Sequence, residues 1–178
     1  LAALRAIPGL QVIRPADANE TSAAVRLAML HDGPTALVLS RQNLPVVTDG
    51  SGVEFGAGLV QDGDDAVVVA TGSEVSVALA AADELSGDGI SCRVVSMSSW
   101  DRFESSRRRD PSGADSILPH DVPTVSIEAG TTLGWDRYAD VCLGIDRFGA
   151  SAPGGVVMRE LGMTSEAVAA AVRELIGR

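Results

Sequence analysis

The sequence has no lysine and few cysteines, histidines or aromatic residues. All fourteen basic residues are arginines, and the 178 residues include two cysteines, two histidines and 3% aromatics. We interpret the missing lysine as a compositional habit of the source genome. The formal net charge of −10 argues against a general surface for nucleic acid or anionic membranes, because the summed field repels phosphate groups. A phosphate site would have to be local.

The scarce cysteines and the lack of long apolar runs indicate a soluble, cytoplasmic protein. Cys92 and Cys142 lie in apolar, strand-like surroundings without the spacing of a zinc site, so we expect reduced thiols. No apolar run approaches the roughly 20 residues that cross a bilayer. The N-terminal residues also lack the parts of a signal peptide. Because the first residue is Leu1 and not Met, we expect the chain to begin inside a larger one.

Short β-branched runs alternate with longer helical patterns, which is typical of α/β folds with a largely parallel sheet. Their near-continuous apolar character predicts strands that are buried on both faces. The predicted strands are residues 10–14, 35–40, 58–62, 66–71, 92–97, 124–129 and 140–145. The predicted helices are residues 18–30, 73–87 and 165–176.

Capping residues mark the predicted helix ends. Asp17 can cap the first helix while Glu20 reaches back. Ser73 is predicted to cap the second helix, and Gly87 to end it in a left-handed conformation. The third helix is predicted to be capped by Thr164 or Ser165. The first helix is predicted to bury a stripe made of Ala23, Ala24, Leu27 and Leu30.

A segment rich in Gly and Asp at residues 46–65 predicts a linker between two units. We expect residues 1–47 to be a partial α/β unit, the end of a domain too small to close its own core, and residues 48–57 to be the linker. Residues 58–178 should form a three-layer α/β/α domain with a mixed, mostly parallel five-stranded sheet. The first unit must pack on this domain, swap with another chain or stay partly exposed.

Arg41 is the strongest candidate for a binding residue. It directly follows the apolar stretch ALVLS, where a strand is expected to end, and ligands gather at the carboxyl ends of parallel strands. A guanidinium group at such a position can bind a phosphate through two parallel hydrogen bonds. A salt bridge to a neighbouring carboxylate is the alternative interpretation.

Other motifs have both a functional and a structural interpretation. ATGSE, residues 70–74, is either an anion site at a helix start or a tight strand-to-helix turn. Glu128 could be a general base at the end of a buried strand, although no partner is identifiable. His31 and His120 are assigned to a helix end and a loop.

Two further segments are assigned to loops and turns. Arg107 to Arg109 are predicted to lie in a solvated loop. Residues 146–155 are predicted to form a packed turn, with Phe148 as its anchor and Pro153 opening a helix.

Four motifs occur in one order along the chain: DGPTAL at 32–37, SRQNLP at 40–45, ATGSEV at 70–75 and FGASAP at 148–153. In this order they resemble the transketolase family, with residues 13–45 similar to the end of its pyrimidine-binding domain and the remainder similar to its C-terminal domain. Nearly the whole chain is covered. The motif SRQNLP followed by ATGSEV favours transketolase over two related groups, the deoxyxylulose-phosphate synthases and the dehydrogenase beta subunits.

The resemblance implies transfer of a two-carbon ketol unit between sugar phosphates in the pentose phosphate pathway, by a homodimer that uses thiamine diphosphate and magnesium. Arg41 matches the arginine that binds the substrate phosphate in this family. The family's catalytic residues and its cofactor motif lie upstream of Leu1, so we assign no catalytic, cofactor-binding or metal-binding residue to this chain and expect it to be inactive alone.

Three departures qualify the resemblance. The family's diphosphate motif begins with GDG and ends with an asparagine, but the GDG at 87–89 has no asparagine after it, so we interpret it as a helix end. Ser98 stands where the family commonly has proline, and residues 104–121 are too variable for any role to be transferred. A free-standing anion-binding or regulatory module is the alternative function.

Overall fold

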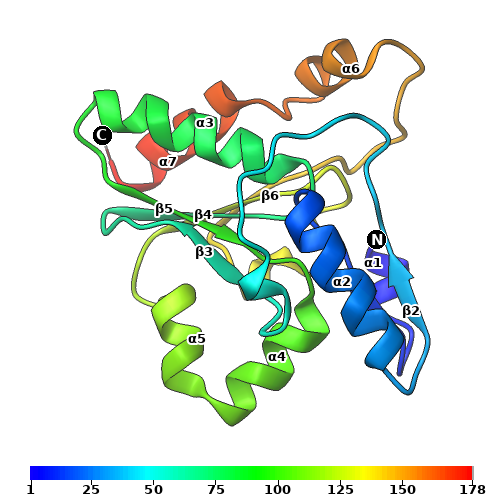
Figure 1. Ribbon diagram of the computed structural model, residues 1–178. Helices are drawn as coiled ribbons and strands as arrows, with labels where there is room; N and C mark the ends of the chain where they lie inside the picture. Colours follow the sequence, from blue (N-terminus) through cyan, green and yellow to red (C-terminus); the bar gives the residue numbers. More distant parts are fainter. Residues whose placement is uncertain (178) are drawn as a thin grey trace.

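The computed structural model describes residues 1–177, which form a small N-terminal unit and a larger C-terminal domain (Figure 1). The N-terminal unit contains α1 (Ala2–Arg5), β1 (Gln11–Ile13), α2 (Ala18–Leu30) and β2 (Thr35–Leu37). β1 and β2 pair in parallel as a separate two-stranded sheet, with Ile13 opposite Leu37. A long segment containing the 3-10 helix η1 (Ser51–Val53) leads to the C-terminal domain.

The C-terminal domain is built on a five-stranded sheet with the order β3-β5-β4-β6-β7. Only the edge strand β3 is antiparallel to its neighbour, and β4, β5, β6 and β7 are parallel. The strands are β3 (Gly58–Gln61), β4 (Ala66–Ala70), β5 (Cys92–Ser96), β6 (Thr124–Ile127) and β7 (Val141–Leu143). The helices are α3 (Glu74–Gly87), α4 (Trp100–Arg109), α5 (Pro111–Ile117), η2 (Trp135–Arg137), α6 (Gly154–Glu160) and α7 (Ser165–Leu175).

Helices cover both faces of this sheet, which makes three layers (Figure 1). α3 and α7 lie on one face, and α4 and α5 lie on the other. The strands bury side chains on both faces: Val68 and Val94 pack with α3 and α7, whereas Val67 and Val95 pack with the aromatic residues of α4 and η2. This explains why most residues of the parallel strands are apolar, and why β4 is entirely so.

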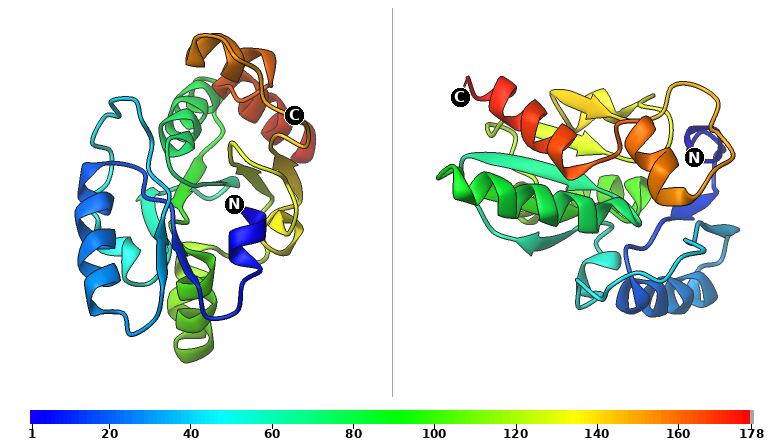
Figure 2. Two further views of the ribbon diagram at one scale, coloured as in Figure 1. Left: turned by 90° about the vertical axis from the view of Figure 1, so that its right-hand side faces the viewer. Right: turned by 90° about the horizontal axis from the view of Figure 1, so that it is seen from above.

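The predicted fold class is confirmed: a three-layer α/β/α domain with a mixed five-stranded sheet, preceded by a partial α/β unit. Every predicted strand and helix is present, with ends that shift by up to three residues. Of the three fates considered for the first unit, packing on the C-terminal domain is the one observed, at one end of the five-stranded sheet (Figure 2). Within residues 1–177, no helix has both the length and the hydropathy needed to span a membrane.

Two loop predictions were wrong. Arg107 to Arg109 form the last turn of α4, where cations complement the partial negative charge of a helix end. The apolar side of this helix, Trp100 and Phe103, is short and was masked by the charged residues around it. Phe148 anchors no turn, because its side chain is 96% exposed in the loop before α6. Pro153 does precede the first residue of α6, as predicted.

The capping predictions are partly confirmed. Asp17 accepts a hydrogen bond from the amide of Glu20, whose carboxylate reaches back to the amide of Ala16. Thr164 caps α7. Ser73, however, makes no capping hydrogen bond, because its hydroxyl donates to Glu74 instead.

Two predictions about helix ends were wrong. Gly89, and not Gly87, has the left-handed conformation after α3, with φ +74°. Leu30 at the end of α2 was predicted to be part of the buried stripe, but its side chain is 69% exposed. A helix of this length rises about 20 Å, whereas two three-residue strands span about 10 Å and leave its last turn uncovered.

Candidate functional site

Arg41 lies in an exposed segment beyond the carboxyl end of β2. β2 ends at Leu37, and one further ladder bond joins the amide of Val38 to the carbonyl of Ile13 at 2.9 Å. No carboxylate within residues 1–177 pairs with Arg41. The alternative salt bridge is therefore absent from the described part of the chain, and the guanidinium group is accessible to a ligand.

The segment that contains Arg41 is a long arch from β2 to η1 (Figure 1). Its far end is held by Asp17, whose carboxylate accepts hydrogen bonds from the amides of Val47 and Thr48 at 2.8 and 2.7 Å. Burial raises the pKa of Asp17, but these amides and that of Glu20 outweigh it and hold the pKa below the usual 3.8. The arch is thus fixed at both ends, and Arg41 lies near its start.

The carboxyl ends of β4 and β6 meet at the point where the strand order of the large sheet reverses. In open α/β sheets, ligands bind in the crevice at this point. Here two glutamates lie at the crevice: Glu74 begins α3, directly after the turn that follows β4, and Glu128 directly follows β6. Both side chains are completely buried.

Arg14 of the N-terminal unit enters this crevice. Its Nη1 lies 2.5 Å from Oε2 of Glu74 and donates to Oγ1 of Thr71 at 2.6 Å. The same carboxylate oxygen of Glu74 accepts a hydrogen bond from the amide of Ala129. The backbone of Arg14 is also held, since its amide donates to the carbonyl of Ser98 at 2.8 Å and its carbonyl accepts from the amide of residue 72 at 3.2 Å.

Arg5 pairs with the second glutamate. Its Nη1 and Nη2 donate to the two oxygens of Glu128 at 2.8 and 2.7 Å, in a bidentate pair. The carboxylate also accepts from the hydroxyl of Thr71 at 2.7 Å and from Nε1 of Trp135 at 3.1 Å. Burial raises the pKa of Glu128, but these donors, Arg5 above all, outweigh it, so the pKa lies below the usual 4.5.

The hydroxyl of Thr71 links the two ion pairs, because it accepts from Arg14 and donates to Glu128. We call these five residues, Arg5, Arg14, Thr71, Glu74 and Glu128, the boundary cluster. The two arginines come from the N-terminal unit, and the other three residues from the C-terminal domain. Every charged group in the boundary cluster therefore has a partner across the boundary.

The boundary cluster explains the ATGSE motif. Gly72 has φ +56°, and a Cβ atom added there would lie 2.6 Å from Cζ of Arg14. The glycine makes room for the arginine, and the turn faces a guanidinium group instead of a free anion site. This geometry supports the tight-turn interpretation. It also speaks against Glu128 as a general base, because all its donors are in place and it has no exposed surface.

The remaining candidates have structural positions. His31 is the exposed C-cap of α2, and His120 lies in a loop with Nε2 3.2 Å from Oδ1 of Asp115. Asp88 of the GDG triplet is bound to Arg173, at 2.6 Å, which does not fit a diphosphate or metal site. Across residues 1–177, no three His, Cys, Asp or Glu side chains gather as a metal ion would require.

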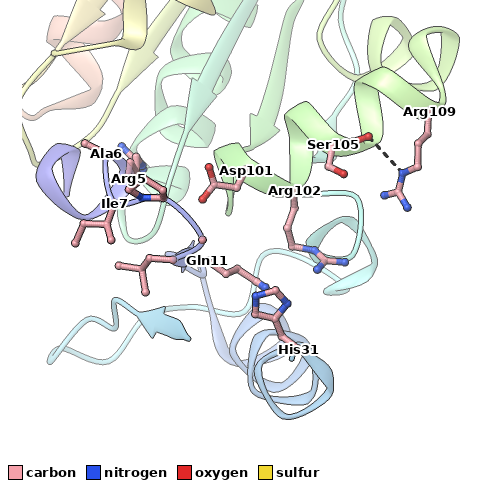
Figure 3. Close-up of a pocket in the computed structure, with 12 residues that line it drawn as sticks. Arg5, Ala6, Ile7, Gln11, His31, Asp101, Arg102, Ser105 and Arg109 are labelled. Carbon is pink, nitrogen blue, oxygen red and sulfur yellow. Dashed lines mark hydrogen bonds between the residues drawn. The ribbon is translucent and has the colours of Figure 1, made fainter. Parts of the chain in front are cut away.

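A cavity of about 510 Å³ lies beside the boundary cluster, between residues 5–11 and α4 (Figure 3). Arg102 and Arg109 line it, but both donate to backbone carbonyls, of Glu54 at 3.0 Å and Ser105 at 3.3 Å. Sequence reasoning missed both the cavity and the boundary cluster. Arg5 and Arg14 were not candidates, because the partners of each lie more than fifty residues away in the chain.

The fold and its boundary cluster define a class of protein with two α/β units. In this class the N-terminal unit fills the crevice at the strand ends of the C-terminal domain. Comparisons with known proteins identify the family. Residues 1–47 match the model described as the transketolase pyrimidine-binding domain, and residues 56–164 match the transketolase-like C-terminal domain. The chain belongs to the transketolase family.

Curated relatives and solved structures agree with this assignment. The chain is 46% identical over its full length to a transketolase of Geobacillus stearothermophilus, and it spans 28% of that relative. A transketolase structure from Leishmania mexicana superposes with a TM-score of 0.92 at 44% identity, covering 99% of this chain and 27% of that one.

A further structure is described as a transketolase from Pichia stipitis in complex with sedoheptulose-7-phosphate. It has a TM-score of 0.92 at 36% identity, and it covers 99% of this chain and 26% of that one. This chain thus corresponds to the C-terminal part of a transketolase and spans less than a third of each of the three relatives named here.

Proposed function

We propose that this chain is part of an enzyme that transfers a two-carbon ketol unit from a ketose phosphate to an aldose phosphate, and that Arg41 binds the substrate phosphate. The observation that carries the proposal is the position of Arg41: exposed, beyond the carboxyl end of a parallel strand and without a carboxylate partner in residues 1–177. A guanidinium group in that position can bind two phosphate oxygens at once. The sugar phosphate in the related Pichia structure is consistent with such a ligand.

The chemistry of bond cleavage would come from thiamine diphosphate with magnesium, bound by other parts of a longer enzyme. The residues of this chain do not fit that cofactor, since GDG is an exposed helix end and the carboxylate of Asp88 is engaged by Arg173. The part played by this chain is to bind and orient the phosphorylated end of the sugar. A cytoplasmic homodimer of the pentose phosphate pathway is the setting we propose.

We also propose the domain division of 1–47, 48–57 and 58–178. The separate two-stranded and five-stranded sheets support it. A free-standing anion-binding module is less well supported, because Arg14 occupies the turn of ATGSE that would hold the anion.

The test is Arg41→Ala in the complete enzyme, numbered as in this chain. Hydrogen bonds to charged groups contribute about 1.5–3 kcal/mol, so KM for phosphorylated sugars should rise about 10- to 100-fold. KM for an unphosphorylated donor such as hydroxypyruvate, and affinity for the cofactor, should change little. Arg26→Ala is the matched control, because Arg26 is exposed on α2. An equal rise for phosphorylated and unphosphorylated substrates would refute the assignment of Arg41.

A further inference from the structure

The crevice at the strand ends of the C-terminal domain is filled by the N-terminal unit. In other open α/β sheets this position binds a ligand. Here Arg14 and Arg5 occupy it and pair with Glu74 and Glu128, whose side chains are 0% exposed. The N-terminal unit therefore occupies the crevice, and the two glutamates bind guanidinium groups there instead of a small molecule.

Buried ion pairs of this kind specify geometry more than they add stability. Removing two charges from water is costly, and their attraction compensates only when the remaining hydrogen bonds are satisfied. In the boundary cluster Glu128 accepts from three side chains and Glu74 accepts from Arg14 and the amide of Ala129. A shift of the N-terminal unit would break several of these bonds at once, so one arrangement is strongly preferred.

A direct structural path leads from the boundary cluster to Arg41. Arg14 directly follows β1, and β1 pairs with β2 through Ile13 opposite Leu37 and through the bond from Val38 to Ile13. Arg41 lies four residues beyond the end of β2. The position of Arg14 therefore sets the position of β1, of β2 and of the start of the arch.

Outside the boundary cluster, the N-terminal unit is also held by the two backbone hydrogen bonds of Arg14 described above. A small apolar cluster joins Ile13 and Ala24 of this unit to Val53 of η1, with partly buried neighbours. Ala16 packs into the core of the C-terminal domain instead.

We propose that Glu74 and Glu128 are positioning residues for the substrate phosphate: they seat Arg14 and Arg5, and through β1 and β2 they place Arg41. This inference rests on the proposed role of Arg41. It also gives the C-terminal domain a task in the binding of substrate.

The closing experiment uses Glu74→Gln and Glu128→Gln in the complete enzyme. Each change keeps the side-chain size and removes the charge. The ion pair with Arg14 or Arg5 is then lost, so the N-terminal unit should be held less firmly against the C-terminal domain. We expect KM for phosphorylated sugars to rise about three- to tenfold, a loss of about 1 kcal/mol in binding. The KM for hydroxypyruvate and kcat should be nearly unchanged, because hydroxypyruvate carries no phosphate for Arg41 to bind. Amide exchange in β1 and β2 should accelerate, while β4 and β6 stay protected.

Asp62→Asn is the matched control. It also breaks an ion pair, with Arg93 at 2.6 Å, but at the exposed edge of the C-terminal domain. It should change none of these measurements. If the glutamate variants behave like this control, or raise KM equally for both kinds of substrate, the positioning role is wrong.

Thr71→Val is a milder variant for the case in which a glutamine variant fails to fold. It keeps every charge and both ion pairs but removes the hydroxyl that links them. A smaller, phosphate-selective rise in KM is expected, and no selective rise would overturn the proposal. If Arg41→Ala raises KM equally for phosphorylated and unphosphorylated substrates, the proposed function fails. If Arg41→Ala raises KM only for phosphorylated substrates but the boundary-cluster variants do not, this inference alone fails.

Discussion

The N-terminal unit and the C-terminal domain are stabilised in different ways. The C-terminal domain has an apolar core on each face of its sheet, and residues such as Leu85 and Val68 are completely buried. The N-terminal unit buries few apolar side chains of its own and exposes Met29 and Leu30. Its fixed points are instead polar: the boundary cluster and the hydrogen bonds of Asp17.

This difference shows how the described residues of the N-terminal unit are fixed on the C-terminal domain by polar contacts more than by apolar packing. Apolar burial provides free energy but little direction, whereas ion pairs and hydrogen bonds are directional. The N-terminal unit, whose proposed task is to place Arg41, therefore needs directional contacts. The prediction that follows is that truncating apolar side chains damages the C-terminal domain, and changing charges damages the seating of the N-terminal unit.

The largest expected effect comes from one leucine in each region. Leu85→Ala should lower the free energy of unfolding by about 2–5 kcal/mol, because it leaves a cavity in a filled core. Leu30→Ala should change it by less than about 0.5 kcal/mol, because Leu30 is 69% exposed. Denaturant unfolding of the chain measures both values. Similar losses from the two variants would contradict the contrast between the regions.

Much of the C-terminal domain could be predicted from sequence, for a physical reason. Strands buried on both faces favour apolar runs. Such a run is continuous at 66–70, and at 92–96 it is interrupted only by Arg93 and Ser96. α4 was missed because its apolar side is short, and Arg107 to Arg109 resemble a loop when their position in a helix is unknown. The exposure of Phe148 was missed because an aromatic side chain is usually buried.

The candidate site was less predictable. Arg41 could be recognised because a charged residue directly after an apolar strand is a pattern of neighbouring residues. The boundary cluster has none: Arg5 and Glu128 are 123 residues apart in the chain, and Arg14 and Glu74 are 60 apart. The sequence alone does not show that Arg14 is buried. It also does not show that Gly72 is needed because Arg14 lies against it. Long-range pairing is information that local patterns do not contain.

The next effect is the dependence of stability on pH. The pKa of Glu128 lies below its usual 4.5 in the folded chain, because the donors around it, Arg5 above all, outweigh the effect of burial. Its stabilising contribution is present above the unfolded pKa and is lost as the pH falls through the folded pKa. Glu20 acts in the opposite direction, because burial raises its pKa. As the pH falls through this range, protonation of the two groups therefore changes the melting temperature in opposite directions.

Comparison with Glu128→Gln isolates the contribution of this one group. Glutamine does not titrate, so the variant should be less stable than the parent at pH 7, and the gap should narrow as the pH falls toward 3. Glu20 is unchanged in both proteins and cancels. Thermal unfolding at several pH values measures the gap. A gap that stays constant between pH 7 and pH 3 would show that the carboxylate charge of Glu128 does not stabilise the fold.

The smallest effect should come from an exposed ion pair within the C-terminal domain. Arg173 of α7 lies 2.6 Å from Asp88 and 2.9 Å from Glu84, distances similar to those in the boundary cluster. Its environment differs, because water and salt reach all three side chains and screen their attraction. Arg173→Gln should therefore lower the melting temperature only slightly at low ionic strength and not at all in high salt, whereas the loss caused by Glu128→Gln should persist in high salt. If high salt removed the loss of melting temperature equally in both variants, burial would not distinguish the boundary cluster from an ordinary surface ion pair. The contrast between the two regions would then not explain how the N-terminal unit is held.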